Sequence, residues 1–143
     1  MATEAAGVAL RCQAAQESGV LDLSHCKLME VPTTALSFFL KGVEIFEVNL
    51  SNNQLKRIPG KLLKDFSTMK TLNVSANLLV SVPEKICELN CLTTIDMSSN
   101  ALITIPKVPS SVISVDLSNN KISSITEENM EHIHNTCKYI LKE

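Results

Sequence analysis

Hydrophobic and polar positions follow one short pattern in five places along this chain. Each copy has two aliphatic-class residues separated by one other residue, then an amide or a cysteine three positions later, and one more aliphatic two positions after that. The copies begin at Leu21, Val48, Leu72, Ile95 and Val115. Because side chains alternate between the two faces of a strand, each copy predicts a short strand with one buried face.

The spacing of these copies indicates a repeat architecture. Their starting residues lie 27, 24, 23 and 20 positions apart, and an aliphatic-proline pair follows each of the first four copies at the same distance. A unit of this length can bury its apolar side only by stacking on its neighbours. The pairs are Val31-Pro32, Ile58-Pro59, Val82-Pro83 and Ile105-Pro106.

The full pattern, L-x-x-L-x-L-x-x-N-x-L-x-x-[LIV]-P, resembles that of intracellular leucine-rich repeat proteins over roughly residues 20–126. This resemblance implies an α/β solenoid of about five repeats. It also implies a short parallel sheet on the concave side, a mixed helical and extended convex side, and helical caps.

The segments between the strands differ in the structure that they predict. Apolar residues at spacings of three and four predict short helices over Thr33–Lys41, Gly60–Met69 and Glu84–Leu92. The fourth spacer, Pro106–Val112, has two prolines three positions apart, which cannot continue a helix, and is expected to be extended. It resembles the twenty-residue repeats of bacterial effector leucine-rich repeat proteins.

A single domain over residues 1–143 is expected, with a cover at each end of the stack. Residues 1–18 are expected to form an N-terminal helical cap with Val8, Cys12 and Ala15 on its inner side. Residues 19–126 are expected to form the repeats, and residues 127–143 a C-terminal capping helix. Thr126 is a suitable residue for the start of that last helix. Its expected apolar face consists of Met130, Ile133, Cys137, Ile140 and Leu141.

The recurrent amide predicts a structural ladder inside the stack. An asparagine side chain has two N–H donors and one acceptor, so it can satisfy backbone groups left unpaired where the chain turns. Removing one should cost about 1–3 kcal/mol. Cys26 is a weaker donor, which the terminal repeat can tolerate because it has only one neighbour. The ladder positions are Cys26, Asn53, Asn77, Asn100 and Asn120.

The polar residue between the two strand aliphatics should point outward from the concave face. Two interpretations stay open: these are ordinary soluble positions, or they form a mildly acidic stripe that docks a basic partner. Glu47 lies in the neighbouring column. The candidate partner-binding residues are Asp22, Glu47, Asn49, Asn73, Asp96 and Asp116.

The concave face should be too small to bind tightly by itself. Five short strands would present about 400–500 Å², against about 800 Å² per partner in a standard interface. A tight partner must therefore also contact a flank, for which Phe38, Phe46 and the pair Lys56 and Arg57 are candidates. Phe46 adjoins a core position and is expected to pack against the long first spacer.

The sequence predicts no catalytic, cofactor or metal site. Cys87 and Cys91 lie four apart on a predicted helix, but no second Cys or His pair has a suitable spacing, so two ordinary buried or half-buried thiols are expected. Glycine occurs only four times and never clustered. The repeated serines lack a nearby column of histidines to act as base.

Charge and cysteine content favour a protein-binding function in a reducing compartment. The formal charge is -2, which gives no general attraction to nucleic acid or to anionic membranes. Five cysteines without a framework spacing, a start that does not resemble a signal peptide, and the lack of a long apolar run predict a cytoplasmic or nuclear protein.

The expected function is non-catalytic binding of another protein, as an adaptor or regulatory subunit. The alternative is a structural or self-associating subunit that uses a flank or a sheet edge. A monomer is expected, with a homodimer left open, and the acidic column disfavours RNA binding.

Overall fold

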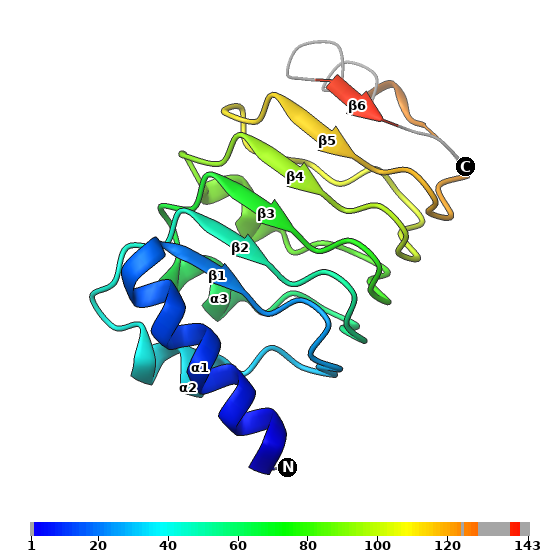
Figure 1. Ribbon diagram of the computed structural model, residues 1–143. Helices are drawn as coiled ribbons and strands as arrows, with labels where there is room; N and C mark the ends of the chain where they lie inside the picture. The colour runs from blue at the N-terminus through cyan, green and yellow to red at the C-terminus, as the bar shows by residue number, and fades with distance from the viewer. Residues whose placement is uncertain (1, 124, 129–137, 141–143) are drawn as a thin grey trace.

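The computed structural model describes residues 2–123, 125–128 and 138–140, and its strands form one parallel sheet in chain order (Figure 1). Each strand pairs with the next, and the connections between β1 and β5 cross from one strand to its neighbour on the convex side. This confirms the solenoid. The strands are β1 (Val20–Asp22), β2 (Glu47–Asn49), β3 (Thr71–Asn73), β4 (Thr94–Asp96), β5 (Ser114–Asp116) and β6 (Lys138–Ile140).

The core is a stack of thin aliphatic layers. The first aliphatic of each copy is at most 1% exposed, and the second is equally buried. Phe66 is a buried aromatic in this core. Layers only one strand spacing thick leave little room for rings, which explains why aromatic residues make up only 3% of the chain.

The convex side loses helix as the repeats shorten. The first three spacers form α2 (Thr33–Phe39, seven residues), α3 (Gly60–Asp65, six residues) and the 3-10 helix η1 (Glu84–Glu88, five residues). The fourth has no helix, as its prolines predict. All three helices end two to four residues before the predicted ones. The third is also a tighter helix, because a shorter spacer must cross the same distance with fewer residues.

The predicted N-terminal cap is helix α1 (Ala2–Ser18), which lies beside β1 at one end of the stack (Figure 1). The three side chains expected on its inner side, Val8, Cys12 and Ala15, are buried. Gly19 ends the helix with φ of 74°, and its N–H donates to the Ala15 carbonyl at 2.9 Å. A left-handed residue at this position is typical of helix ends.

The prediction of one capping helix over residues 127–143 is wrong at its C-terminal part. Residues 127 and 128 are helical, but Lys138–Ile140 form strand β6, which pairs in parallel with β5. The open edge of β5 offers backbone donors and acceptors that a strand can pair and a helix cannot. The remaining residues of this prediction, Met130, Ile133, Cys137 and Leu141 among them, lie outside the described residues.

Candidate functional site

The predicted concave column exists and is in register. In the parallel pairing of the sheet, Asp22 is opposite Asn49, which is opposite Asn73, and the series continues through Asp96 to Asp116. The sequence pattern therefore placed one polar side chain per repeat correctly on one face. Beyond Asp116 the paired residue is Ile140 in β6, so the polar column ends at the fifth repeat.

Each residue of this column also stabilises the turn after its own strand. Its Oδ1 accepts a hydrogen bond from the backbone N–H of the serine two residues later, at 2.9–3.0 Å in all five repeats. The hydroxyls of Ser24, Ser75, Ser98 and Ser118 donate to the same oxygen at 2.6–2.7 Å. These bonds form a second row along the stack, the Asx–Ser ladder. The prediction from the sequence did not include it, although an aspartate or asparagine two residues before a serine recurs in every repeat.

At the N-terminal end of the column, Asp22 is already paired. The Arg11 Nη1 donates to the Asp22 carbonyl oxygen at 2.8 Å and lies 3.4 Å from its Oδ1. Partial burial raises the pKa of Asp22, but hydrogen bonds from Ser24 and the charges of Arg11 and His25 outweigh it and lower the pKa below its usual value. The N-terminal cap thereby neutralises one end of the predicted acidic stripe.

Three carboxylates remain on the concave face: Glu47, Asp96 and Asp116. Glu47 begins β2 and is exposed, whereas Asp96 and Asp116 are half-buried by the serines that they hold. The ion pairs of the described residues do not involve any of the three. No cation of the described part of the chain therefore forms an ion pair with them.

The internal ladder is confirmed as a structural feature. Asn77 shows its geometry: its Nδ2 donates to carbonyls of its own repeat (Val74 and Ser75) and to Leu50 of the preceding one, while its Oδ1 accepts from the Leu55 N–H at 3.0 Å. The same pattern of bonds recurs in the other repeats that have an asparagine at this position, at Asn53, Asn100 and Asn120. Each asparagine thus joins two repeats through buried or half-buried bonds.

Cys26 ends this ladder by a different arrangement. Its Sγ lies 3.4 Å from the Ser24 carbonyl oxygen, to which the thiol donates weakly. The Oδ1 of Asn53 accepts from both the Cys26 and the Leu28 N–H, at 3.1 and 2.9 Å. One asparagine therefore satisfies two donors, which is why the first repeat tolerates a thiol.

A left-handed residue precedes every ladder position. Its φ lies between 53° and 57° in all five repeats, although no glycine occupies it. Asparagine tolerates this conformation well, and alanine and serine do so at a cost. The residues are His25, Asn52, Ala76, Ser99 and Asn119.

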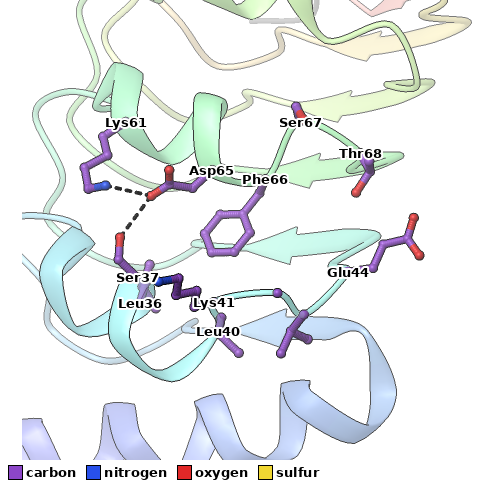
Figure 2. A pocket seen from close by; sticks show the side chains of 12 residues that line it. Leu36, Ser37, Leu40, Lys41, Glu44, Lys61, Asp65, Phe66, Ser67 and Thr68 are labelled. Carbon is purple, nitrogen blue, oxygen red and sulfur yellow. Dashed lines mark hydrogen bonds and ion pairs between the residues drawn. The ribbon is translucent and has the colours of Figure 1, made fainter.

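A pocket of about 590 Å³ lies on the convex side where α2 and α3 end (Figure 2). The Asp65 Oδ2 accepts from Lys61 Nζ and from the Ser37 hydroxyl, each at 3.0 Å. The Lys61 hydrogen bond and charge, aided by Ser37, lower the pKa of Asp65. These groups hold α2 against α3, and the lowered pKa makes the Asp65 carboxylate a poor base for the Ser37 hydroxyl that donates to it.

The proposed flank residues do not form one surface. Phe46 lies just before the N-terminal end of β2, whereas Lys56 and Arg57 lie beyond its C-terminal end. Phe46 is 40% exposed, and its ring lies against Gly19, where an added Cβ would be 2.9 Å from its Cδ2. The ring is thus more exposed than expected, and Lys70 Nζ lies 5.6 Å from its centroid. Its contact with the first spacer stays a prediction.

The flank after β2 contains a depression of about 420 Å³ lined by Met29, Lys56 and Arg57 among others. Phe38, 79% exposed, lines a second depression on α2. The two depressions share Glu30, Val31 and Thr33, so Phe38 and the basic pair lie on adjoining surfaces.

Cys87 and Cys91, the pair with a spacing of four, lie differently from the prediction. Cys87 lies in η1, and Cys91 lies beyond the helix that was predicted to carry both. Both thiols are exposed, so the expectation that they are buried or half-buried is wrong. The part of the chain that the structure describes contains no cluster of three or more potential metal ligands. Within that part, no helix has the length and apolar character to cross a membrane.

Comparisons with known proteins agree with this architecture. Residues 44–102 match the family described as leucine rich repeat. The chain is 35% identical over 127 residues to mouse leucine-rich repeat and calponin homology domain-containing protein 1, covering 85% of the chain and 17% of that protein. It is 32% identical over 96 residues to human leucine-rich repeat-containing protein 20, covering 64% of the chain and 52% of that protein.

A solved structure shows the same fold. The leucine-rich repeat domain of a Shigella effector superimposes with a TM-score of 0.68 over 96% of the chain and 55% of that domain, at 21% identity. The chain spans about half or less of the length of the curated relatives named above. The repeated consensus, the parallel stack with its asparagine ladder, and these matches show that the chain belongs to the leucine-rich repeat family.

Proposed function

We propose that the chain is a non-catalytic adaptor or regulatory subunit that binds another protein through its concave face and one flank. Leucine-rich repeat proteins generally mediate protein–protein interactions. The observation that carries the proposal is the set of three carboxylates, Glu47, Asp96 and Asp116, on a rigid polar face. They would attract a basic segment of a partner.

The concave face would supply orientation rather than most of the affinity. Its side chains are short, and the anchors that dominate binding energy, Trp, Tyr and Arg, do not occur in its column. We place the protein in the cytoplasm, with the nucleus as the alternative. Among the described residues, Cys12, Cys26, Cys87 and Cys91 are free thiols, which fits a reducing compartment.

The test is capture of a partner from reduced lysate by the immobilised chain, followed by mass spectrometry. The informative variant is Asp96→Asn with Asp116→Asn and Glu47→Gln, which removes three negative charges. At positions 96 and 116 the amide keeps the Oδ1 that the following serine needs. A tenfold or greater loss of captured partner is expected. Unchanged capture by this folded variant would contradict the concave site.

The alternative, a structural subunit that associates with its own copies, makes a different prediction. Sedimentation velocity over a hundredfold range of concentration should show a constant monomer if the chain is an adaptor. A concentration-dependent dimer that the triple variant leaves unchanged would favour self-association through a flank or a sheet edge.

A further inference from the structure

The turns that follow the strands stack in register as well as the strands themselves. One backbone hydrogen bond per repeat joins them: Gln54 N–H to Leu28 O, Leu78 to Leu55, Ala101 to Leu79, and Lys121 to Leu102, at 2.8–2.9 Å. The residue after each of these acceptors therefore falls in one row along the flank. The members of this flank row, in repeats one to four, are Met29, Lys56, Val80 and Ile103.

Three of the four side chains in the flank row are large, apolar and exposed. Met29 is 67% exposed, Val80 55% and Ile103 57%, and Leu78 beside them is 50% exposed. In a solenoid whose neighbouring positions are almost fully buried, exposed apolar residues gathered on one flank indicate a contact surface rather than scattered surface residues.

The fourth member brings positive charge into the row. Lys56 and its neighbour Arg57 line the 420 Å³ depression beside Met29, where Glu30 is the acidic lining residue. The ion pairs of the described residues are Arg11–Asp22, Lys61–Asp65 and Lys107–Glu128, so neither flank cation is held by a described carboxylate. The depression therefore has two positive side chains and one negative one, so it is positively charged in a chain whose net charge is -2.

We propose that this flank binds a short segment of a partner protein in which an acidic residue lies close to apolar ones. The acidic side chain would bind Lys56 and Arg57, whose guanidinium can hold a carboxylate through two bonds. The apolar side chains would cover Val80 and Ile103. The proposal rests on the protein-binding function proposed above and identifies its flank and the chemistry of the segment that fits it.

The dimensions of the row suit a short extended peptide. Met29 and Ile103 are three repeats apart, which at a strand spacing of about 4.8 Å is roughly 14 Å. An extended chain advances about 3.3 Å per residue, so four or five residues span this distance. The flank and the concave face would then select opposite charges on the same partner.

The experiment is selection of a phage-displayed library of random twelve-residue peptides on the immobilised chain. Enriched peptides should contain Asp or Glu close to Leu, Ile, Val or Phe, and their affinity is measured by fluorescence anisotropy. Lys56→Glu with Arg57→Glu should weaken binding at least tenfold. The control pair, Lys64→Glu with Lys85→Glu on the convex side, makes the same change in net charge and should leave affinity within twofold.

A second pair of variants tests the apolar part. Val80→Ser with Ile103→Ser should weaken binding at least fivefold, whereas Leu10→Ser with Ile113→Ser should not, since Leu10 and Ile113 are equally exposed, 66% and 65%, at other surfaces. Failure to enrich acidic–apolar peptides, or equal effects of the flank and control pairs, would overturn the proposal.

A variant of the concave face distinguishes failure of the flank site from failure of the proposed protein-binding function. Asp96→Asn with Asp116→Asn should leave peptide affinity unchanged while it weakens partner capture. Peptide binding that depends on these two aspartates and not on Lys56 and Arg57 would overturn the flank site and leave the concave site standing. A dimer in sedimentation that the flank substitutions abolish would assign the row to a second copy of the chain and also overturn the proposal.

Discussion

Two ladders of side-chain oxygens run along this solenoid, and they stabilise it in different ways. The internal ladder of asparagines joins each repeat to the one before it, through buried or half-buried bonds such as those of Asn77 to Leu50 and Leu55. The Asx–Ser ladder on the concave face stays within single repeats, as Asn73 does with Ser75. The internal ladder sets the register between repeats, and the outer one sets the turn inside each repeat.

The difference explains where variation is tolerated. The internal position needs donors and an acceptor together, so it is asparagine wherever a preceding repeat exists. The outer position needs only one acceptor oxygen, so either aspartate or asparagine can occupy it. This freedom lets the concave face vary its charge without changing its fold.

The largest expected effect on stability separates alanine substitutions of two asparagines in the same repeat. Asn77→Ala leaves the buried Leu55 N–H without its acceptor and removes three donor contacts, which should lower the free energy of unfolding by about 3 kcal/mol. Asn73→Ala removes bonds that water can replace and should cost about 1 kcal/mol. Urea denaturation of both variants gives the two values. Equal costs would contradict the distinction between the ladders.

A smaller effect is expected within the outer ladder itself. Asp96→Ala should lower the free energy of unfolding by about 1 kcal/mol, because the Ser98 N–H and hydroxyl lose their shared acceptor. Asp96→Asn keeps the oxygen and should stay within about 0.5 kcal/mol of the parent chain. Thermal and urea denaturation at neutral pH measure both. If Asn is as damaging as Ala, the charge and not the acceptor stabilises the turn.

The smallest effect concerns the left-handed residue between the two ladders. Ala76 has φ of 53°, so Ala76→Gly should raise the free energy of unfolding by about 0.5 kcal/mol, the relief of strain exceeding the entropy cost of glycine. Ala101→Gly is the matched control, since Ala101 is not among the residues of positive φ, and should lower stability by about 0.5–1 kcal/mol. The same sign for both substitutions would contradict the strain argument.

Much of the candidate site followed from the repeat pattern. Once Leu21 and its four equivalents were aligned, the sheet register fixed Asp22, Asn49, Asn73, Asp96 and Asp116 in one column, and the pairing confirms that alignment. The inner side of α1 was predictable for the same reason, since a helix spacing identifies Val8, Cys12 and Ala15. Patterns of this kind depend on local geometry that the sequence encodes directly.

Contacts between distant segments were not predictable in this way. Nothing in the sequence around Arg11 or Asp22 indicates that the two residues form an ion pair. Helix α1 brings the Arg11 guanidinium to the Asp22 carboxylate, and this offsets one negative charge of the concave face. The flank row likewise became a surface only when the turns stacked, because the four residues are separated by more than twenty positions at each step.

The sequence by itself determined the repeat, the strand faces and the asparagine ladder, because each depends on spacing within one unit. Only the tertiary structure decided how the stack ends. An apolar helical spacing suggested a helix over residues 127–143, yet Lys138–Ile140 pair with β5. The physical reason is that an open strand edge presents unpaired backbone groups, and pairing them outweighs the helix preference of a three-residue segment.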